Sequence, residues 1–534
     1  MEEGCPEPDS GVLGAPSVNG HSSPAGCTGS TPGESQDPFQ EPADVGGTSG
    51  GDGEPPGWIS ESAGEPGDRP DDHGDRLDET DRETTRYLAA ATQLNLEYAR
   101  SVVKHIIGEP FCAVAPAAGA DVVAVTRWAL AALRRRAQRD LVLTCLLVVG
   151  VAVAIGAWTW IPIAVIAVLA VFVVAYERWV RDVKIIARQM LRERFRAHDA
   201  PSSPSQRIEK RLAVVGRQQN GNLVVFRGRS PFVGSGEEVI SDHIVVNVAV
   251  GKKGKKGKRQ APMPFSTPEL HEALEAALKR MEFRDIRVGQ RLYVNGEHVI
   301  SDPRLLPDKF QPPATDAPAN LLRDGCIPAS EARTYVCAEI GGWKGQLVVS
   351  LFTRAVQSSG SLQVEWMFYV LPPLNTHFLV IDQLYELPVM WQVSKAMATG
   401  LLSFGPALVS APVNLARYAT VPVKEMAHRA KQSYRIRRGQ VFNYGSPRSI
   451  REGPISYRRP HDFVAEDVLT FVVLGHHTLL RALGIFLNAH NVDMQRFDSQ
   501  EQVIYSKVNK YNVDNLRAQN VTFGNKSHAG DDKK

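Results

Sequence analysis

The chain has 534 residues, enough for two or three domains with hydrophobic cores, and a net charge of +3. Residues 1–80 hold 18 Asp and Glu against two Arg, so the rest of the chain carries a net charge of +19. A basic body favours anionic partners, and an acidic tail can compete for the same surface. The six cysteines form no CxxC pair, which argues against a zinc or redox site and against a disulfide-stabilised domain.

The acidic tail, residues 1–80, is rich in Gly, Pro, Ser, Asp and Glu and has few aromatic residues. It cannot bury enough apolar surface to offset chain entropy, so we predict that it is disordered. Two cytoplasmic helices are predicted within 81–140. Apolar residues at helical spacing define the first helix up to Ile107, and Asp121 is a good N-cap for the second.

The strongest signal is the stretch 141–176, which is 36 residues long and contains no charge. As one straight helix it would be ~54 Å long, whereas the hydrocarbon core of a bilayer is ~30 Å thick. Trp160 and Pro162 fall in its middle, where Trp favours the membrane interface and Pro breaks a helix. The sequence predicts a transmembrane hairpin with spans 141–157 and 161–176; the alternative is a buried hairpin in a soluble protein.

Basic residues flank this stretch on both sides, and cations prefer the cytoplasmic face of a membrane. They are Arg134, Arg135, Arg136 and Arg139 before it, and Arg178, Arg181, Lys184, Arg188, Arg192, Arg194 and Arg196 after it. A multi-pass protein of the cell membrane with both termini cytoplasmic satisfies this pattern. The segment 177–199 is predicted as a basic juxtamembrane helix, which either lies along the lipid headgroups or packs on the domain beyond it.

After a linker at 201–205 the pattern changes to strands, and we predict an α+β domain over 206–311. Its expected elements are strands 211–217, 222–228 and 243–250, a helix over 266–282, and strands 285–295 and 297–301. Asn-Gly pairs at 220–221 and 295–296 suggest hairpin turns.

A second strand-plus-helix region is predicted over 321–432, with strands 333–343, 345–356 and 361–371 and a helix from about Ile381. An Arg/Tyr-rich loop at 433–461, a helix at 462–491 and an Asn-rich C-terminal tail at 500–534 complete the chain. The apolar stretch 396–413 contains Pro406 and Pro412, so an interfacial or core role is expected rather than a span. The fold class is therefore α+β: an integral membrane protein with a two-helix transmembrane hairpin and a cytoplasmic α+β region.

Two segments are candidate anion sites. The basic run GKKGKKGKR, residues 251–259, could contact anionic lipid headgroups or nucleic acid, of which nucleic acid is the less favoured; a solvated loop is the main alternative, because its glycines disfavour a helix. Its cations are Lys252, Lys253, Lys255, Lys256, Lys258 and Arg259. The loop 227–238 could hold an anion between backbone N–H groups and two arginines, or it is an ordinary glycine-containing loop. Its candidate residues are Arg227, Arg229, Gly234 and Gly236.

The catalytic motifs GxxxxGK[ST], HExxH and GxSxG and the kinase signatures are absent from the sequence, and we predict no cofactor and no metal. Glu365, Asp382 and Glu386 could form a carboxylate group, but their spacing is not diagnostic. His476 and His477 are adjacent on a predicted helix, so one is expected to pack and the other to be exposed.

The Asn-rich tail could stack in β arcs between identical chains or add a strand to a protein partner; the alternative is a frayed end. Its asparagines are Asn509, Asn512, Asn515, Asn520 and Asn525.

The segments APAAGADVVAVTRWALAALRRR and NLVVFRGRSPFVGSGE, with the Asn-rich end, resemble uncharacterised membrane proteins of high-GC actinobacteria. The resemblance implies no activity. The expected function is a membrane-anchored, cytoplasmic-facing scaffold or sensor that binds partners through its cytoplasmic region. The alternative is an enzyme or nucleotide-responsive effector at the same membrane face.

Overall fold

The computed structural model describes residues 72–156, 160–254, 258–283, 285–379, 381–384, 388–454 and 462–514, which belong to one unit of the chain. The predicted disordered tail up to position 71, the hairpin tip at 157–159 and the tail beyond 514 lie outside the described residues. Helix α1 (Asp72–Leu94) begins inside the segment predicted to be disordered.

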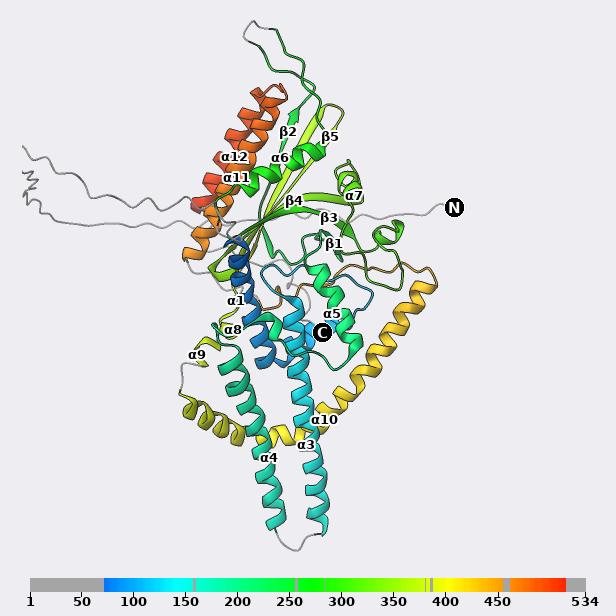
Figure 1. The fold of residues 1–534 in the computed structure, drawn as a ribbon, viewed down its shortest axis with the longest axis vertical. Helices are drawn as coiled ribbons and strands as arrows, with labels where there is room; N and C mark the ends of the chain where they lie inside the picture. Colours follow the sequence, from blue (N-terminus) through cyan, green and yellow to red (C-terminus); the bar gives the residue numbers. More distant parts are fainter. Residues whose placement is uncertain are drawn as a thin grey trace, which may run out of the picture. The chain divides into compact units, whose positions relative to one another are not determined.

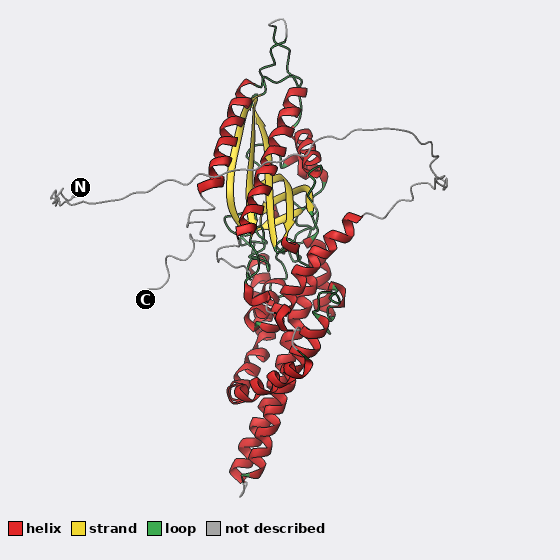
Figure 2. Cartoon of the chain, turned by 90° about the vertical axis from the view of Figure 1, so that its left-hand side faces the viewer, coloured by secondary structure: helices red, strands yellow, loops and turns green. Residues whose placement is uncertain are grey.

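One six-stranded sheet forms the centre of the body (Figures 1 and 2), which confirms the predicted mixture of helices and sheet. In spatial order its strands are β1 (Leu223–Phe226), β3 (Ile286–Asn295), β4 (Ala332–Gly342), β5 (Leu347–Ser358), β6 (Ser361–Leu371) and β2 (Glu237–Asn247). β1 runs parallel to β3, and the other neighbouring strands in this sheet are antiparallel. The sheet joins the two regions that the sequence separates at 311–320.

Three helices cover one face of this sheet: α6 (Thr267–Lys279), α11 (Asp462–Ala489) and α12 (Gln495–Asp514). Ser266 and Glu269 form a capping box that starts α6, within the helix predicted over 266–282. Trp366 of β6 donates its indole N–H to Nε2 of His476 on α11 at 2.8 Å. His476 is buried and His477 is exposed, which confirms the expectation for this pair.

A second core lies in a helical region built from α1, α2 (Leu96–Ile106), the first half of α3 (Val122–Gly156) and α5 (Gln206–Gln219). Asn95 accepts hydrogen bonds from the N–H groups of Glu97 and Tyr98, so it caps α2 and divides the single helix predicted before Ile107. Asp121 caps α3 as predicted, by accepting a bond from Val123 N at 2.8 Å.

Helix α4 (Ile161–Trp179) returns from the far end of α3 and continues as a π-helical segment, η1 (Val180–Gln189). The helix predicted over 177–199 therefore ends at Gln189, because the chain turns there to bury Met190 and Phe195 in the helical core. The short elements are η2 (Ala197–Asp199), η3 (Val299–Ser301), α7 (Ala319–Asp324), η4 (Trp343–Gly345), α8 (Thr376–Leu379) and α9 (Ile381–Leu384).

Two predicted strands are wrong. Residues 211–217 lie in α5, because Ile208, Leu212 and Val215 recur at helical spacing and pack on the helical core. Residues 297–301 form a turn that leads into the helical turn η3 (Val299–Ser301), so no strand follows β3 there. Gly296 instead lies close against the backbone of Gly445.

Helix α10 (Val389–Arg437) is one 49-residue helix that contains Pro406, Pro412 and Pro422. It includes the apolar stretch 396–413 and the first residues of the predicted loop 433–461, of which 455–461 lie outside the described residues. The start of the Asn-rich tail is also helical, in α12, so Asn509 and Asn512 do not form a β ladder.

A tight contact between α11 and β6 yields the first prediction. A Cβ at Gly475 would lie 2.9 Å from Cε1 of Phe368, so Gly475→Val must push α11 away from the sheet. We expect a loss of about 1–3 kcal/mol in the free energy of unfolding, measured by urea unfolding in detergent.

The matched control is Gly289→Ala in β3, where an added Cβ meets no atom within 4 Å. It should change stability by less than about 0.5 kcal/mol. Wild-type stability of Gly475→Val would contradict the close packing of α11 on β6.

Candidate functional site

The hairpin of α3 and α4 exposes a continuous apolar surface. Leu143 is the last buried residue of α3, and beyond it Val148 and Ile155 are 63% and 85% exposed. The other large exposed apolar residues here are Leu141, Val142, Val149, Val151, Trp160, Ile161, Ile163, Val165, Val168, Leu169, Phe172 and Tyr176. Monomeric soluble proteins rarely expose apolar patches of this kind, so this surface needs a cover.

Helix α10 packs across both helices of the hairpin (Figure 1). Ala411 joins a small core with Leu143 and Val174, and a Cβ at Gly400 would lie 3.0 Å from that of Ala175. The outer side of α10 is apolar as well, with Leu402 and Val409 exposed.

Four helical segments in the described part of the chain are long and apolar enough to cross a membrane. They are Val122–Gly156, Ile161–Gln189, Val393–Arg437 and Phe463–Ala489. The last of these lies in α11, whose apolar residues Leu479, Leu483 and Leu487 are buried in the core over the sheet. By length and composition these helices fit a membrane protein, and the largest exposed apolar surface is that of α3, α4 and α10, although α11 also exposes Phe463 and Ile485.

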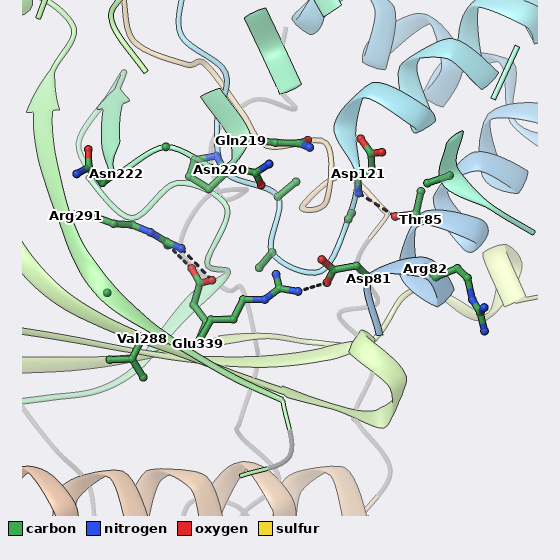
Figure 3. A pocket seen from close by; sticks show the side chains of 18 of the residues that line it. Asp81, Arg82, Thr85, Asp121, Gln219, Asn220, Asn222, Val288, Arg291 and Glu339 are labelled. Carbon is green, nitrogen blue, oxygen red and sulfur yellow. Dashed lines mark hydrogen bonds and ion pairs between the residues drawn. The ribbon is translucent and has the colours of Figure 1, made fainter. Parts of the chain in front are cut away.

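A polar cavity of about 1080 Å³ lies where the sheet meets the helical region (Figure 3). α1 contributes Asp81 and Thr85, the start of α3 contributes Asp121, and β3 and β4 contribute the arginines and the glutamate described next. Residues 196–198 and 219–222 complete the wall, so six segments of the chain surround one space.

Ion pairs hold the charged side chains of this cavity. Arg287 Nη2 lies 2.6 Å from Asp81 Oδ1, and Arg291 pairs with Glu339. Burial raises the cost of ionising Glu339, but the Arg291 guanidinium outweighs it and holds the pKa of this carboxyl below its ordinary value. The cavity therefore presents fixed charges of both signs, which suits a polar ligand with complementary groups.

The N-cap residue of α3, Asp121, is part of the cavity wall. The N–H of Asp121 donates to Thr85 Oγ1 at 2.8 Å, and the N–H of Val122 donates to Gln219 Oε1 at 3.0 Å. A group bound in the cavity would therefore touch the residues that hold the start of this helix.

The glycine-containing loop 227–238, a candidate anion site, contacts a carboxyl group of its own chain. Gly234 and Gly236 have φ of +94° and +85°, and the N–H of Gly234 donates to Glu452 Oε1 at 2.6 Å. Burial raises the pKa of Glu452, although backbone N–H groups oppose this shift. Arg227 donates to the carbonyl of Asn443 at 3.3 Å, and Arg229 is exposed.

The basic run forms the loop between β2 and α6. Lys252 donates to Asn488 Oδ1 at the end of α11. The backbones of Lys253 and Arg259 form an antiparallel β-bridge across the loop. Lys258 is exposed, and Lys255 and Lys256 lie outside the described residues.

This loop leaves the sheet beside Ser361, at one end of β6, whereas Leu371 at the other end leads to Leu374 in the helical core. At 3.3 Å per residue the length of β6 separates the loop from that core by about 33 Å. The arrangement does not favour contact between the run and a bilayer that holds the hairpin, and the partner of the run stays open.

The predicted carboxylate group is not assembled. Glu365 lies 3.7 Å from Arg354, whereas Asp382 binds Arg86 at 2.8 Å and Tyr87; Glu386 lies outside the described residues. Within the described ranges no three His, Cys, Asp or Glu side chains are placed to hold a metal ion.

The sequence did not point to the cavity residues, which come from separate segments without a motif. One signal was present: Arg287 and Arg291 lie two positions either side of Gly289 in a strand, so they share one face of the sheet.

Comparison with known families identifies residues 243–525, more than half of the chain, as an AbeC-like domain, and the chain belongs to this family. The matched region runs from β2 to the C-terminal tail, so it includes α10 and α11 but not the hairpin or β1. Neither the curated proteins nor the solved structures gave a match.

The contact between Glu452 and the loop yields the second prediction. Glu452→Ala leaves the buried N–H of Gly234 without its acceptor and should cost about 1–3 kcal/mol in the free energy of unfolding. Glu452→Gln keeps an acceptor oxygen and should cost less.

The pH dependence follows from the raised pKa of Glu452 in the folded chain. Above the unfolded pKa of about 4.3 the unfolded state ionises more readily, so wild type loses stability relative to Glu452→Gln as pH rises through the folded pKa. Urea unfolding between pH 4 and 7 checks this, and an Ala variant as stable as wild type would refute the role of the carboxylate.

Proposed function

We propose that this member of the AbeC-like family is a membrane-anchored sensor with a cytoplasmic body that binds a small polar ligand in the cavity of Figure 3. The observation that carries the proposal is the continuity of α3, whose N-cap residue Asp121 lines the cavity and whose last half belongs to the apolar hairpin. A ligand that shifts the start of this helix acts on an element that reaches the membrane.

The anchor is the hairpin of α3 and α4, with the spans 141–157 and 161–176. Burying its exposed apolar side chains in hydrocarbon removes them from water, and the flanking arginines set both chain termini on the cytoplasmic side. From Leu143 to Gly156 the helix extends only about 20 Å, so the bilayer thins around the hairpin or the flanking side chains reach outward. The composition bias toward Ala, Arg, Gly and Pro further suggests an actinobacterial source.

Helix α10 lies at the cytoplasmic interface in this proposal. Its exposed Leu401, Val409 and Val413 recur at intervals that place them on one side of the helix, while the buried Ala411 faces the hairpin. An apolar stripe beside a polar face suits a helix that lies in the headgroup layer.

The enzymatic or nucleotide-responsive alternative would have to use the same polar cavity, because Glu452 occupies the glycine-containing loop. The sensor is favoured because the cavity walls are ion-paired and capped groups rather than an arrangement of nucleophile and base.

Membrane insertion yields the third prediction, with Cys145 of the hairpin as an exposed native reporter. In a Cys5→Ser, Cys27→Ser background, a membrane-impermeant maleimide should leave Cys145 unlabelled in native membranes and label it after detergent denaturation. Labelling of Cys145 in intact membranes would refute insertion.

Two introduced cysteines test the topology in the same background with Cys145→Ser. Gly156→Cys at the far end of α3 should react from the outside of intact cells if the hairpin spans the bilayer. Lys253→Cys, in the exposed loop after β2, should react only in opened or inverted vesicles. Exchange of these two patterns would reverse the proposed orientation.

Ligand binding yields the fourth prediction. The detergent-solubilised chain is screened by thermal shift against nucleotides, sugar phosphates and amino acids, and at least one class should raise its Tm. Arg287→Ala removes a charged cavity side chain and should abolish that rise, whereas Arg323→Ala, an exposed arginine of α7 outside the cavity, should not. A shift that survives Arg287→Ala would place the ligand elsewhere, and no shift with any class would refute the sensor.

A further inference from the structure

A second cavity, of about 640 Å³, lies between α3, α4 and the linker Pro201–Pro204. On α3 its lining residues recur at intervals of three and four from Arg127 to Val142, so they form one face of that helix. On α4 they run from Phe172 to the first residue of η1, Val180. We call this space the hairpin groove.

The hairpin groove changes from charged to apolar along its length. Its α3 wall begins with Arg127 and ends with Val142, next to the exposed part of the hairpin. On the opposite wall, Glu177 and Val180 lie toward the body, and Phe172 and Val173 lie toward the hairpin end. The apolar end therefore opens where the proposed hydrocarbon layer begins.

Arginines outnumber acids in the charged part: Arg127, Arg134, Arg135 and Arg139 line it against one carboxylate, Glu177. Arg135 and Arg139 lie 3.4 and 3.7 Å from Glu177, and Arg139 also pairs with the buried Asp140 at 2.7 Å. Arg127 pairs with Glu209 outside the groove at 2.6 Å. Arg134 is exposed, and its side chain makes no hydrogen bond or ion pair within the described part of the chain.

These contacts fix the groove while leaving positive charge for a ligand. Arg135 also donates to Gln93 Oε1 at 2.9 Å, so its guanidinium is held in place from the helical core. Glu177 and Asp140 together neutralise Arg135 and Arg139, so the positive charge left for a ligand is that of Arg134. A guanidinium group can bind a phosphate through two parallel N–H···O bonds. Basic pockets between membrane helices at the cytoplasmic side suit phospholipid headgroups.

We infer that the hairpin groove binds one anionic phospholipid of the cytoplasmic leaflet. Its phosphate binds the guanidinium of Arg134, and an acyl chain runs along Val142, Phe172 and Val173 toward the bilayer. The volume lies within the range of small-molecule sites and accommodates a headgroup with the upper part of the acyl chains. This inference rests on the proposed membrane insertion and adds a specific lipid class to it.

The test uses the full chain in detergent and native mass spectrometry after incubation with phosphatidylglycerol or with phosphatidylcholine. Wild type should retain one phosphatidylglycerol and no phosphatidylcholine. Arg134→Gln should weaken retention about fivefold, as expected for one cation beside an anionic headgroup. Ser202→Glu, which adds a carboxylate to the exposed linker over the groove, should weaken it as well.

The matched control is Arg188→Gln, which removes an equally exposed cation of η1 that does not line the groove. It should retain the lipid as wild type does. Equal loss in Arg188→Gln and Arg134→Gln would reduce the effect to general surface charge and overturn the inference. Displacement of the lipid by millimolar inorganic phosphate alone would show a free-phosphate site and would also overturn it.

Cysteine protection separates this inference from the proposed function. Arg134→Gln should keep Cys145 protected in membranes, because it leaves the hairpin unchanged. If Cys145 is protected and wild type retains no anionic lipid, the groove inference fails and the anchor stands. If Cys145 is labelled in membranes, the anchor fails first.

Discussion

Hydrogen bonds to the first half of α3 fix the direction of the whole helix. Thr85 and Gln219 hold the first two N–H groups, and Arg136 donates to the carbonyl of Gln93 at 2.7 Å, near the end of α1. A helix of this length is stiff, so anchoring one half in the helical core sets where the exposed half points. The same bonds build a wall of the polar cavity, and the cavity and the hairpin are therefore two ends of one element.

Helix α10 adds a second constraint. Both of its ends are linked to the sheet, and its middle packs on the hairpin. It follows β6 through α8 and α9, and it leads to Tyr444, whose N–H donates to the carbonyl of Gly296 after β3 at 3.0 Å. Between these points, small residues such as Gly400 let α10 approach α4 closely. A movement of the hairpin relative to the body would have to break this packing, so the three helices form one apolar assembly at the base of the sheet.

The sequence predicts those features whose signal is local. The uncharged stretch 141–176 marks the hairpin helices without any knowledge of their surroundings, and runs rich in β-branched and aromatic residues mark β4, β5 and β6. Helix α5 was predicted as a strand because its β-branched and apolar residues are typical of strands. Only their packing against the helical core favours a helix.

Sites that depend on long-range contacts could not be predicted in the same way. Glu452, which fills the glycine-containing loop, is more than 200 positions from Gly234, and the cavity charges Asp81, Arg287 and Glu339 come from three elements. No spacing along the chain predicts that these residues lie together. The sequence did offer this loop as a candidate anion site, and the backbone N–H of Gly234 donates to the Glu452 carboxyl group as it could to a phosphate.

The cations of this chain also show that a high density of charge in the sequence does not decide where a charged ligand can bind in the fold. The basic run at 251–259 concentrates the most charge in the fewest residues, yet it lies a strand length away from the helical core. The arginines of α3 are spread over more than three helical turns and look like a simple flank of the hairpin. Helical periodicity brings Arg127, Arg134 and Arg139 onto one face, where α4 and the linker enclose them above apolar side chains. For an amphiphilic ligand this placement matters more than the number of charges, because a phosphate and an acyl chain need adjoining polar and apolar walls.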